Sequence, residues 1–324
     1  MSWLELSLDT THEAVDWVYT LLSETIDIND VYITEYAESD AANSHWTFTM
    51  RLYLPYDISA RTGVEKITSL LSPLHRTGMT TAIQTNVVEK KITDAPQPRL
   101  YPIGERFIIV NSDTPAESEI ADKITLKLQK TLAFGSGLHP ATILSLRLLE
   151  RYIVPNMQVL DFGSGSGILS VAIAKLGANV LALDNDHVAV QATQQTVSLN
   201  NVEPQVKVMQ GSLGCGSNLG HWMGGNTVNN VPQIEAEDTF DVIVANIFSR
   251  VHIALADDFR RALRHHQAQP GLLITAGFTT DHEESVTTAL TEAGFEVIDC
   301  ERLNEWVALA HRCQLKKPDF PQHI

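Results

Sequence analysis

The chain has 324 residues, of which 44% are hydrophobic and 19% charged, and its formal net charge is −16 at pH 7. This length allows two domains with separate cores, and this composition is typical of globular proteins. The acidic balance argues against nucleic-acid binding as the main function, because phosphate backbones would be repelled. The sequence lacks a signal-peptide pattern and an apolar run of the roughly 20 residues that span a bilayer. Its 3 cysteines lack CxxC spacing, so neither a disulfide framework nor a zinc knuckle is expected. A reducing, cytoplasmic location is expected instead.

Residues 1–90 are predicted to form a small α+β domain. Strand-like patterns occur at residues 3–8, 31–36, 46–54 and 80–88, and two helical patterns separate them. Thr10 or Thr11 is expected to cap the first helix, and Ser59 the second. The resulting order, strand-helix-strand-strand-helix-strand, is that of a ferredoxin-like domain.

Residues 91–130 are predicted to be a linker and lead-in segment, because EKKITDAPQPRLYPIG is rich in proline and only RFIIVN reads as a strand. From residue 131 to 315 strands and helices alternate, which predicts an α/β domain with a parallel sheet covered on both faces. One helix is expected over residues 252–266. The last two strands, FEVIDCERL and WVALAHRC, are joined by so short a turn that they must form an antiparallel hairpin at the sheet edge.

Residues 212–238 form a long loop rich in glycine and asparagine. It is compatible with a lid that carries Trp222 or with a tolerated surface insertion. We favour the insertion, because surface loops accept added residues readily.

The strongest local motif is VLDFGSGSG, residues 159–167, in which a predicted strand ends in glycines that open a helix. Such glycines allow the backbone to approach a ligand closely. The dinucleotide fingerprint GxGxxG would need glycine where this chain has Ile168 or Ser170. The pattern that starts at Asp161 is DxGxGxG, which is typical of S-adenosylmethionine sites. A glycine-rich turn without a ligand is the alternative.

Two further polar residues end neighbouring predicted strands, Asp184 after NVLAL and Asn246 after DVIVA. The carboxyl ends of parallel strands meet at one edge of the sheet. A carboxylate there can accept hydrogen bonds from both ribose hydroxyls of a nucleoside. Asp186 competes for that role and could instead cap the next helix, and we favour Asp184 because it follows the strand immediately. Asn246 offers both a donor and an acceptor, for a cofactor group or for an incoming amine.

Together these segments resemble the class I S-adenosylmethionine-dependent methyltransferases, and more narrowly the family that methylates ribosomal protein L11. The resemblance rests on MSWLELSL, LAFGSGLHPAT, VLDFGSGSGILSVAIAKLGA, DVIVANI and NEWVALAHR, of which LAFGSGLHPAT is the most specific. It implies a Rossmann-like, seven-stranded sheet with an antiparallel final hairpin. It also implies S-adenosylmethionine as the cofactor, and a ferredoxin-like domain at residues 1–90 that recognises the substrate and swings on the linker.

The resemblance further implies a set of site residues. The cofactor would be contacted by Phe134, Thr142, Gly163, Gly165, Asp184 and Asn246. Asn246 would also orient the acceptor amine, and no metal is expected. The chain departs from the family at Leu138, where threonine is usual, and at Ser164, where cysteine is usual. These differences affect the substrate-facing parts more than the cofactor site.

The expected function is therefore methyl transfer from S-adenosylmethionine to amino groups of a protein, on lysine side chains or the N-terminal amine. The expected substrate is the basic ribosomal protein L11. A class I methyltransferase for another protein or a small molecule, and a non-catalytic S-adenosylmethionine-binding protein, remain alternatives. The glycine spacing disfavours an NAD-dependent oxidoreductase. Neither a membrane nor a nucleic acid is expected as a partner, and a monomer is favoured.

Overall fold

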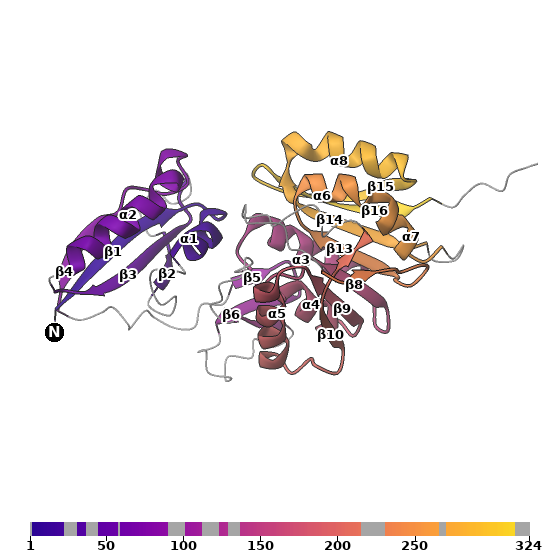
Figure 1. The fold of residues 1–324 in the computed structure, drawn as a ribbon, viewed down its shortest axis with the longest axis horizontal. Helices are drawn as coiled ribbons and strands as arrows, with labels where there is room; N and C mark the ends of the chain where they lie inside the picture. Colours follow the sequence, from indigo (N-terminus) through magenta and orange to yellow (C-terminus); the bar gives the residue numbers. More distant parts are fainter. Residues whose placement is uncertain are drawn as a thin grey trace, which may run out of the picture.

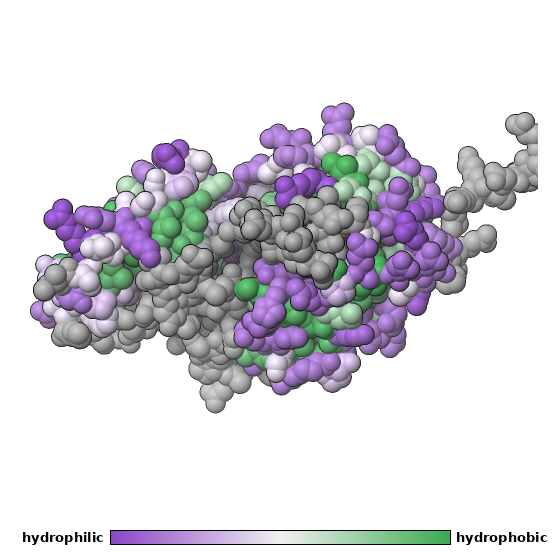
Figure 2. Space-filling view, in the orientation of Figure 1, coloured by the Kyte–Doolittle hydropathy of each residue, from purple (hydrophilic) through white to green (hydrophobic). Residues whose placement is uncertain are grey.

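The computed structural model describes residues 2–22, 31–36, 45–57, 59–89, 101–111, 123–128, 137–214, 231–265 and 270–314. They form an N-terminal unit with a four-stranded sheet, a three-stranded sheet, and a larger unit with a seven-stranded sheet. Figure 1 shows the N-terminal unit at one end of the molecule, with helix α1 and strand β5 on the side where the two units meet. In Figure 2, hydrophilic residues cover much of the described surface of the larger unit, as expected for a chain of this charge.

The N-terminal unit alternates strands and helices in the predicted order. Its elements are β1 (Trp3–Thr10), α1 (Ala14–Leu22), β2 (Val31–Glu35), β3 (Phe48–Pro55), α2 (Ala60–Arg76) and β4 (Gln84–Val88). The strand order is β2-β3-β1-β4 with antiparallel pairing throughout, so the ferredoxin-like prediction is confirmed. Leu6 and Leu8 of β1 pack with Ile67 and Leu71 of α2 in its core.

The two predicted helix caps of this unit differ in outcome. Thr11 Oγ1 accepts a hydrogen bond from the Ala14 amide at 3.3 Å, as expected. Ser59 is the N-cap residue of α2, as predicted, but it does not cap the helix through its side chain. Its hydroxyl donates to Asp57 Oδ1 at 2.5 Å instead.

The three-stranded sheet consists of β5 (Tyr101–Ile103), β6 (Phe107–Asn111) and β7 (Ile124–Leu128). Strand β5 pairs antiparallel with β6, and β7 pairs parallel with it. The sequence predicted β6 alone. Phe107 and Leu126 are fully buried in the same hydrophobic cluster as the first helices of the larger unit. The lead-in segment therefore contributes to the core beside the glycine-rich motif.

The larger sheet has the order β10-β9-β8-β13-β14-β16-β15. Its strands are β8 (Gln158–Phe162), β9 (Asn179–Asp184), β10 (Val206–Gln210), β13 (Val242–Asn246), β14 (Leu272–Thr279), β15 (Phe295–Leu303) and β16 (Trp306–Cys313). Strand β16 runs antiparallel to both of its neighbours, whereas β10, β9, β8, β13 and β14 pair in parallel. The predicted class I sheet with a final antiparallel hairpin is confirmed.

Helices cover both faces of this sheet. They are α3 (Pro140–Tyr152), α4 (Ile168–Lys175), α5 (His187–Leu199), α6 (Ser249–Ala254), α7 (Ala256–Ala262) and α8 (Thr280–Glu292). Helices α3, α4 and α5 contribute to one hydrophobic cluster, and α6, α7 and α8 to a second. The prediction of one helix over residues 252–266 is wrong, because the helical path breaks at Leu255. Leu255 has φ −106° and ψ 12°, outside the α-helical region, and its side chain is fully buried in the second cluster.

The long loop begins and ends at a short parallel pair, β11 (Ser212–Leu213) and β12 (Gln233–Ile234). Its central part, residues 215–230, lies outside the described residues, and so does Trp222. Within the described part of the chain, no helix combines the length and apolarity needed to cross a membrane.

Candidate active site

Three of the proposed cofactor residues meet at the carboxyl edge of the sheet. Phe162, the last residue of β8, pairs with Leu183 of β9 on one side and with Ala245 of β13 on the other. The next residues along these strands are Gly163, Asp184 and Asn246. The parallel register therefore places the glycine loop between the carboxylate of Asp184 and the amide of Asn246.

The loop after β8 needs glycine for two reasons. Gly163 and Gly167 have positive φ angles of 78° and 82°, which side-chain-bearing residues rarely adopt. A Cβ atom on Gly163 would lie 2.5 Å from Cγ2 of Ile247, and one on Gly167 would lie 2.8 Å from the Cα of Thr193. The sequence folds into this tight turn because it lacks side chains at these positions.

Gly167→Ala is expected to lower the free energy of unfolding by about 3 kcal/mol, through a left-handed backbone and overpacking against a backbone atom. Gly78→Ala is the matched control, because Gly78 has a φ of 75° but nothing within 4 Å of an added Cβ. It should cost about 1 kcal/mol. Calorimetry of both variants measures the two losses, and equal losses would contradict the role of the contact with Thr193.

Asp184 holds the loop and the start of α5. Its Oδ2 accepts a hydrogen bond from the Gly165 amide at 2.9 Å, and its Oδ1 accepts one from the Asp186 amide at 2.9 Å. Burial raises the pKa of this carboxyl, and the backbone hydrogen bonds oppose that rise. Asp186 instead caps α5, because its side chain accepts from the Val188 amide at 2.9 Å. Of the two carboxylates, Asp184, which the sequence favoured, is the one that contacts the glycine loop.

Asp161 is fully buried beneath the same loop. Its Oδ2 accepts a hydrogen bond from the Ser170 hydroxyl at 2.5 Å. Its Oδ1, like the Ser166 hydroxyl, has no hydrogen-bond partner among the described residues. Burial, reinforced by the negative charge of Asp184, raises the pKa of Asp161 to about 7. Sequence reasoning used Asp161 only as the first letter of DxGxGxG, and its pairing with Ser170 was missed.

Helix α5 also clamps the loop. Thr193 Oγ1 donates to the Gly165 carbonyl at 3.0 Å and lies 2.9 Å from the Ser164 hydroxyl. The hydroxyl of Ser164, at a position where the family usually has cysteine, thus takes part in this contact. Thr193 carried no signal in the sequence, because its role depends on how α5 packs over the loop.

Helix α3 contacts Asn246 through its first turn. Asn246 Nδ2 donates to Thr142 Oγ1 at 3.3 Å, and Thr142 is buried. The helix begins at Pro140, and His139 is its N-cap, with Nδ1 accepting from the Ala141 amide at 3.2 Å. Burial, together with the nearby His12, lowers the pKa of His139 to about 3, so this ring is neutral and can accept.

Gly137, the first described residue before α3, lies between the three-stranded sheet and the start of α4. A Cβ atom on Gly137 would lie 2.4 Å from Ile109 of β6 and 2.7 Å from Ile168, the first residue of α4. Phe134, proposed from the sequence as a cofactor contact, lies outside the described residues.

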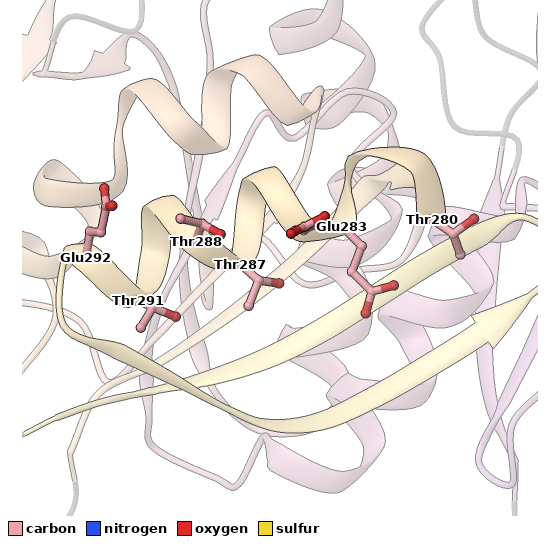
Figure 3. A pocket seen from close by; sticks show the side chains of 7 residues that line it. Thr280, Glu283, Thr287, Thr288, Thr291 and Glu292 are labelled. Atoms are coloured by element: carbon pink, nitrogen blue, oxygen red, sulfur yellow. The ribbon is translucent and has the colours of Figure 1, made fainter.

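A surface hollow elsewhere in the molecule does not compete with this site. It is lined along α8 by Thr280, Glu283, Glu284, Thr287, Thr288, Thr291 and Glu292 (Figure 3). These residues come from a single helix, and none of them belongs to the elements that hold the glycine loop. The described residues also contain no group of three histidine, cysteine or acidic side chains that could bind a metal ion.

The whole described chain matches one protein family. The family model described as "Ribosomal protein L11 methyltransferase (PrmA)" covers residues 2–314. The chain belongs to this family. The ribosomal protein L11 methyltransferase of Chloroflexus aurantiacus is 37% identical over 330 residues, which cover 96% of this chain and 98% of the relative. That of Herpetosiphon aurantiacus is 34% identical over 329 residues, or 96% and 99% of the two chains.

A solved structure is also similar to this member of the L11 methyltransferase family. The crystal structure of the ribosomal protein L11 methylase from Lactobacillus delbrueckii subsp. bulgaricus matches with a TM-score of 0.54 and 25% identity. The match covers 67% of this chain and 100% of that one. The protein is thus a class I methyltransferase that uses S-adenosylmethionine, and the family resemblance seen in the sequence is confirmed.

The residues at the strand ends fit this cofactor. The glycine loop admits close approach of a ligand, and the half-buried Asp184 offers a carboxylate beside it. The unpartnered Oδ1 of Asp161 and hydroxyl of Ser166 are buried polar atoms for which a ligand would compensate. Two carboxyl groups close to each other also favour a ligand that carries positive charge.

Proposed function

We propose that the protein methylates amino groups of ribosomal protein L11, on lysine side chains or on the N-terminal amine. The observation that carries this proposal is the meeting of the glycine loop, Asp184 and the Asn246–Thr142 pair at one sheet edge, in a chain of the L11 methyltransferase family. The relatives named above carry this substrate in their names, which supports the same substrate here.

We propose that Asp184 accepts hydrogen bonds from the ribose hydroxyls of S-adenosylmethionine. The backbone of Gly163 and Gly165 would lie against the bound cofactor. Thr142 and Asn246 would hold its methionine end, and Phe134 would cover it. When bound, the cofactor supplies a methyl group on a positively charged sulfur. Asp161 and Asp184 would place negative charge in the site that holds this positively charged sulfur.

The acceptor amine must be neutral to attack, and a free lysine has a pKa of about 10.4. Burial in a site beside a positive charge lowers the pKa of the amine and favours the neutral form. Asn246 Nδ2 is engaged with Thr142, and the amide oxygen of Asn246 would accept an N–H of the amine and orient its lone pair. The cofactor would supply the methyl group, which its sulfur would release to the amine nitrogen that Asn246 orients, and water would take the proton of the amine. Positioning of this kind supplies most of the rate enhancement.

We propose the N-terminal unit, residues 1–90, as the domain that recognises the substrate, joined by residues 91–130 to the methyltransferase domain at residues 131–315. A net charge of −16 favours a basic protein partner such as L11. A cytoplasmic location and a monomeric state stay predictions that accompany this proposal.

The direct test incubates the purified protein with labelled S-adenosylmethionine and purified L11, beside a whole-cell extract. Label in L11 supports the proposal if the labelled peptides disappear from the peptide map when the lysines and the N-terminus of L11 are chemically blocked. Label in another protein alone would overturn the substrate while leaving the chemistry, and absence of cofactor binding by calorimetry would overturn both.

Asn246→Ala is expected to lower kcat about 100-fold, the order of loss that follows from a misplaced reacting group, and to weaken cofactor affinity as well, because the same amide would hold the methionine end. Thr142→Val removes the partner of Asn246 Nδ2 but leaves the amide oxygen, so it should affect cofactor affinity more than kcat. Steady-state kinetics with binding calorimetry separate the two. Full methyl transfer by Asn246→Ala would rule out a role for this residue in orienting the amine.

A further inference from the structure

Trp306 contacts both units of the molecule. It is the first residue of β16, in the hairpin at the edge of the larger sheet. Its Nε1 donates a hydrogen bond to Glu13 Oε2 at 2.8 Å, and Glu13 lies between β1 and α1 of the N-terminal unit. The indole also contacts the His139 ring edge to face, with centroids 4.4 Å apart and an interplanar angle of 78°.

Apolar side chains surround this contact. Leu138, next to His139, is 6% exposed and packs with Val15 and Phe48 of the N-terminal unit. Tyr101 of β5 adds an edge-to-face contact with Phe48 at 6.1 Å between centroids. Burial raises the pKa of Glu13, and the hydrogen bond from Trp306 opposes that rise. The hydrogen bond from the indole N–H therefore replaces hydrogen bonds to water that the Glu13 carboxylate loses when the units meet.

His139 connects this junction to the candidate active site. It caps α3 through the Ala141 amide, and Thr142, in the same helical turn, accepts the hydrogen bond from Asn246. Direct contacts thus run from Glu13 through Trp306 and His139 to the first turn of α3. A cap that is held in place keeps this turn in the geometry that the proposed cofactor contact needs.

We propose that Trp306 is a positioning residue that couples docking of the N-terminal unit to the binding of S-adenosylmethionine. The proposal rests on the proposed cofactor contact of Thr142. Docking through Glu13 restricts the orientation of the Trp306 indole, and the indole restricts the ring of His139. The ring of His139 then holds the first turn of α3 in place. Coupling between two sites is reciprocal, so bound cofactor also favours the docked arrangement, in which the substrate-recognition unit contacts the helix beside the site.

The test compares variants that keep or remove the donor or the acceptor of the hydrogen bond between Trp306 and Glu13. Trp306→Phe keeps an aromatic ring beside His139 but loses the donor, and Glu13→Ala loses the acceptor. Each is expected to weaken the affinity for S-adenosylmethionine about fivefold, at the lower end of typical coupling between sites. The double variant should equal either single variant, and Glu13→Gln, which keeps an acceptor, should stay within about twofold of the parent.

Hydrogen exchange gives the readout that a purely structural role would not change. Bound S-adenosylmethionine should slow exchange at residues 11–15 of the parent and of Glu13→Gln, but not of Trp306→Phe. Glu283→Ala is the control, because it removes the 2.7 Å ion pair with Arg302 of the same hairpin without touching the N-terminal unit. Unchanged affinity in Trp306→Phe, additive losses in the double variant, or an equal loss in Glu283→Ala would each overturn the coupling. None of these measurements uses L11, so failure of the proposed substrate would leave their outcome unaffected.

Discussion

Asp184→Asn is expected to weaken the affinity for S-adenosylmethionine by about 100-fold or more. The carboxylate would accept two hydrogen bonds from ribose, and a hydrogen bond to a charged group contributes about 1.5–3 kcal/mol. Every 1.4 kcal/mol corresponds to about a tenfold change in affinity. An asparagine has one acceptor oxygen, so either the Gly165 amide or the Asp186 amide also loses its partner. Titration calorimetry measures the affinity directly.

Asp186→Asn is the matched control for this substitution. Asp186 is two residues away and caps α5 through the Val188 amide, and asparagine caps helices as well as aspartate does. Its cofactor affinity should stay within about twofold of the parent. Equal losses in both variants would assign the effect to net charge, and an affinity near that of the parent in Asp184→Asn would remove Asp184 from the ribose site. Thermal unfolding verifies that both variants are folded.

Local patterns predicted most of the fold because each element carries its own period. The strands that end at Asp184 and Asn246 and the final hairpin followed from short apolar runs and a two-residue turn. Strand β5 was missed because its three residues are too short to show a period, whereas β7 carries the alternating pattern ITLKL, which was overlooked inside a segment interpreted as a linker. The break at Leu255 was missed because it is a change in the backbone angles at a leucine that fits the apolar period of a continuous helix.

The site was predictable where glycine or a polar residue stands directly at the end of a predicted strand. Parallel topology sends the carboxyl ends of β8, β9 and β13 to one edge, so Gly163, Asp184 and Asn246 were expected together. Contacts between distant elements were not predictable, and Glu13 with Trp306 is the clearest case. Leu138, noted in the sequence only as a departure from the family, is buried against Val15 and Phe48 of the N-terminal unit, a contact that no local pattern displays.

Asp161→Asn is expected to change stability and cofactor affinity in opposite directions. The pKa of Asp161 rises from 3.8 to about 7 on folding, mainly through burial. The folded chain therefore binds this proton more tightly than the unfolded chain, and the free energy of unfolding falls as the pH rises through this interval. Asparagine carries no charge and can still accept from Ser170. The variant should be more stable than the parent at pH 8 by about 1–3 kcal/mol, and equally stable near pH 4.

The same substitution should weaken the binding of S-adenosylmethionine. A positively charged ligand beside Asp161 favours the ionised carboxylate, so binding below pH 7 releases a proton, and the affinity of the parent should fall by up to about tenfold per pH unit as the pH drops. Asp161→Asn should lack this dependence. Calorimetry in buffers of different ionisation enthalpy counts the released proton, and equal proton release by parent and variant would assign it to another group.

Ser170→Ala tests the origin of this pH dependence. The hydroxyl of Ser170 donates to Asp161 and lowers the pKa of that carboxyl, against the larger effect of burial. Without it the pKa of Asp161 should rise further, and the midpoint of the affinity change should move to higher pH. A midpoint that stays in place would mean that the titrating group is not Asp161. A midpoint that rises would show that one buried hydroxyl sets the pH at which the site accepts its cationic ligand.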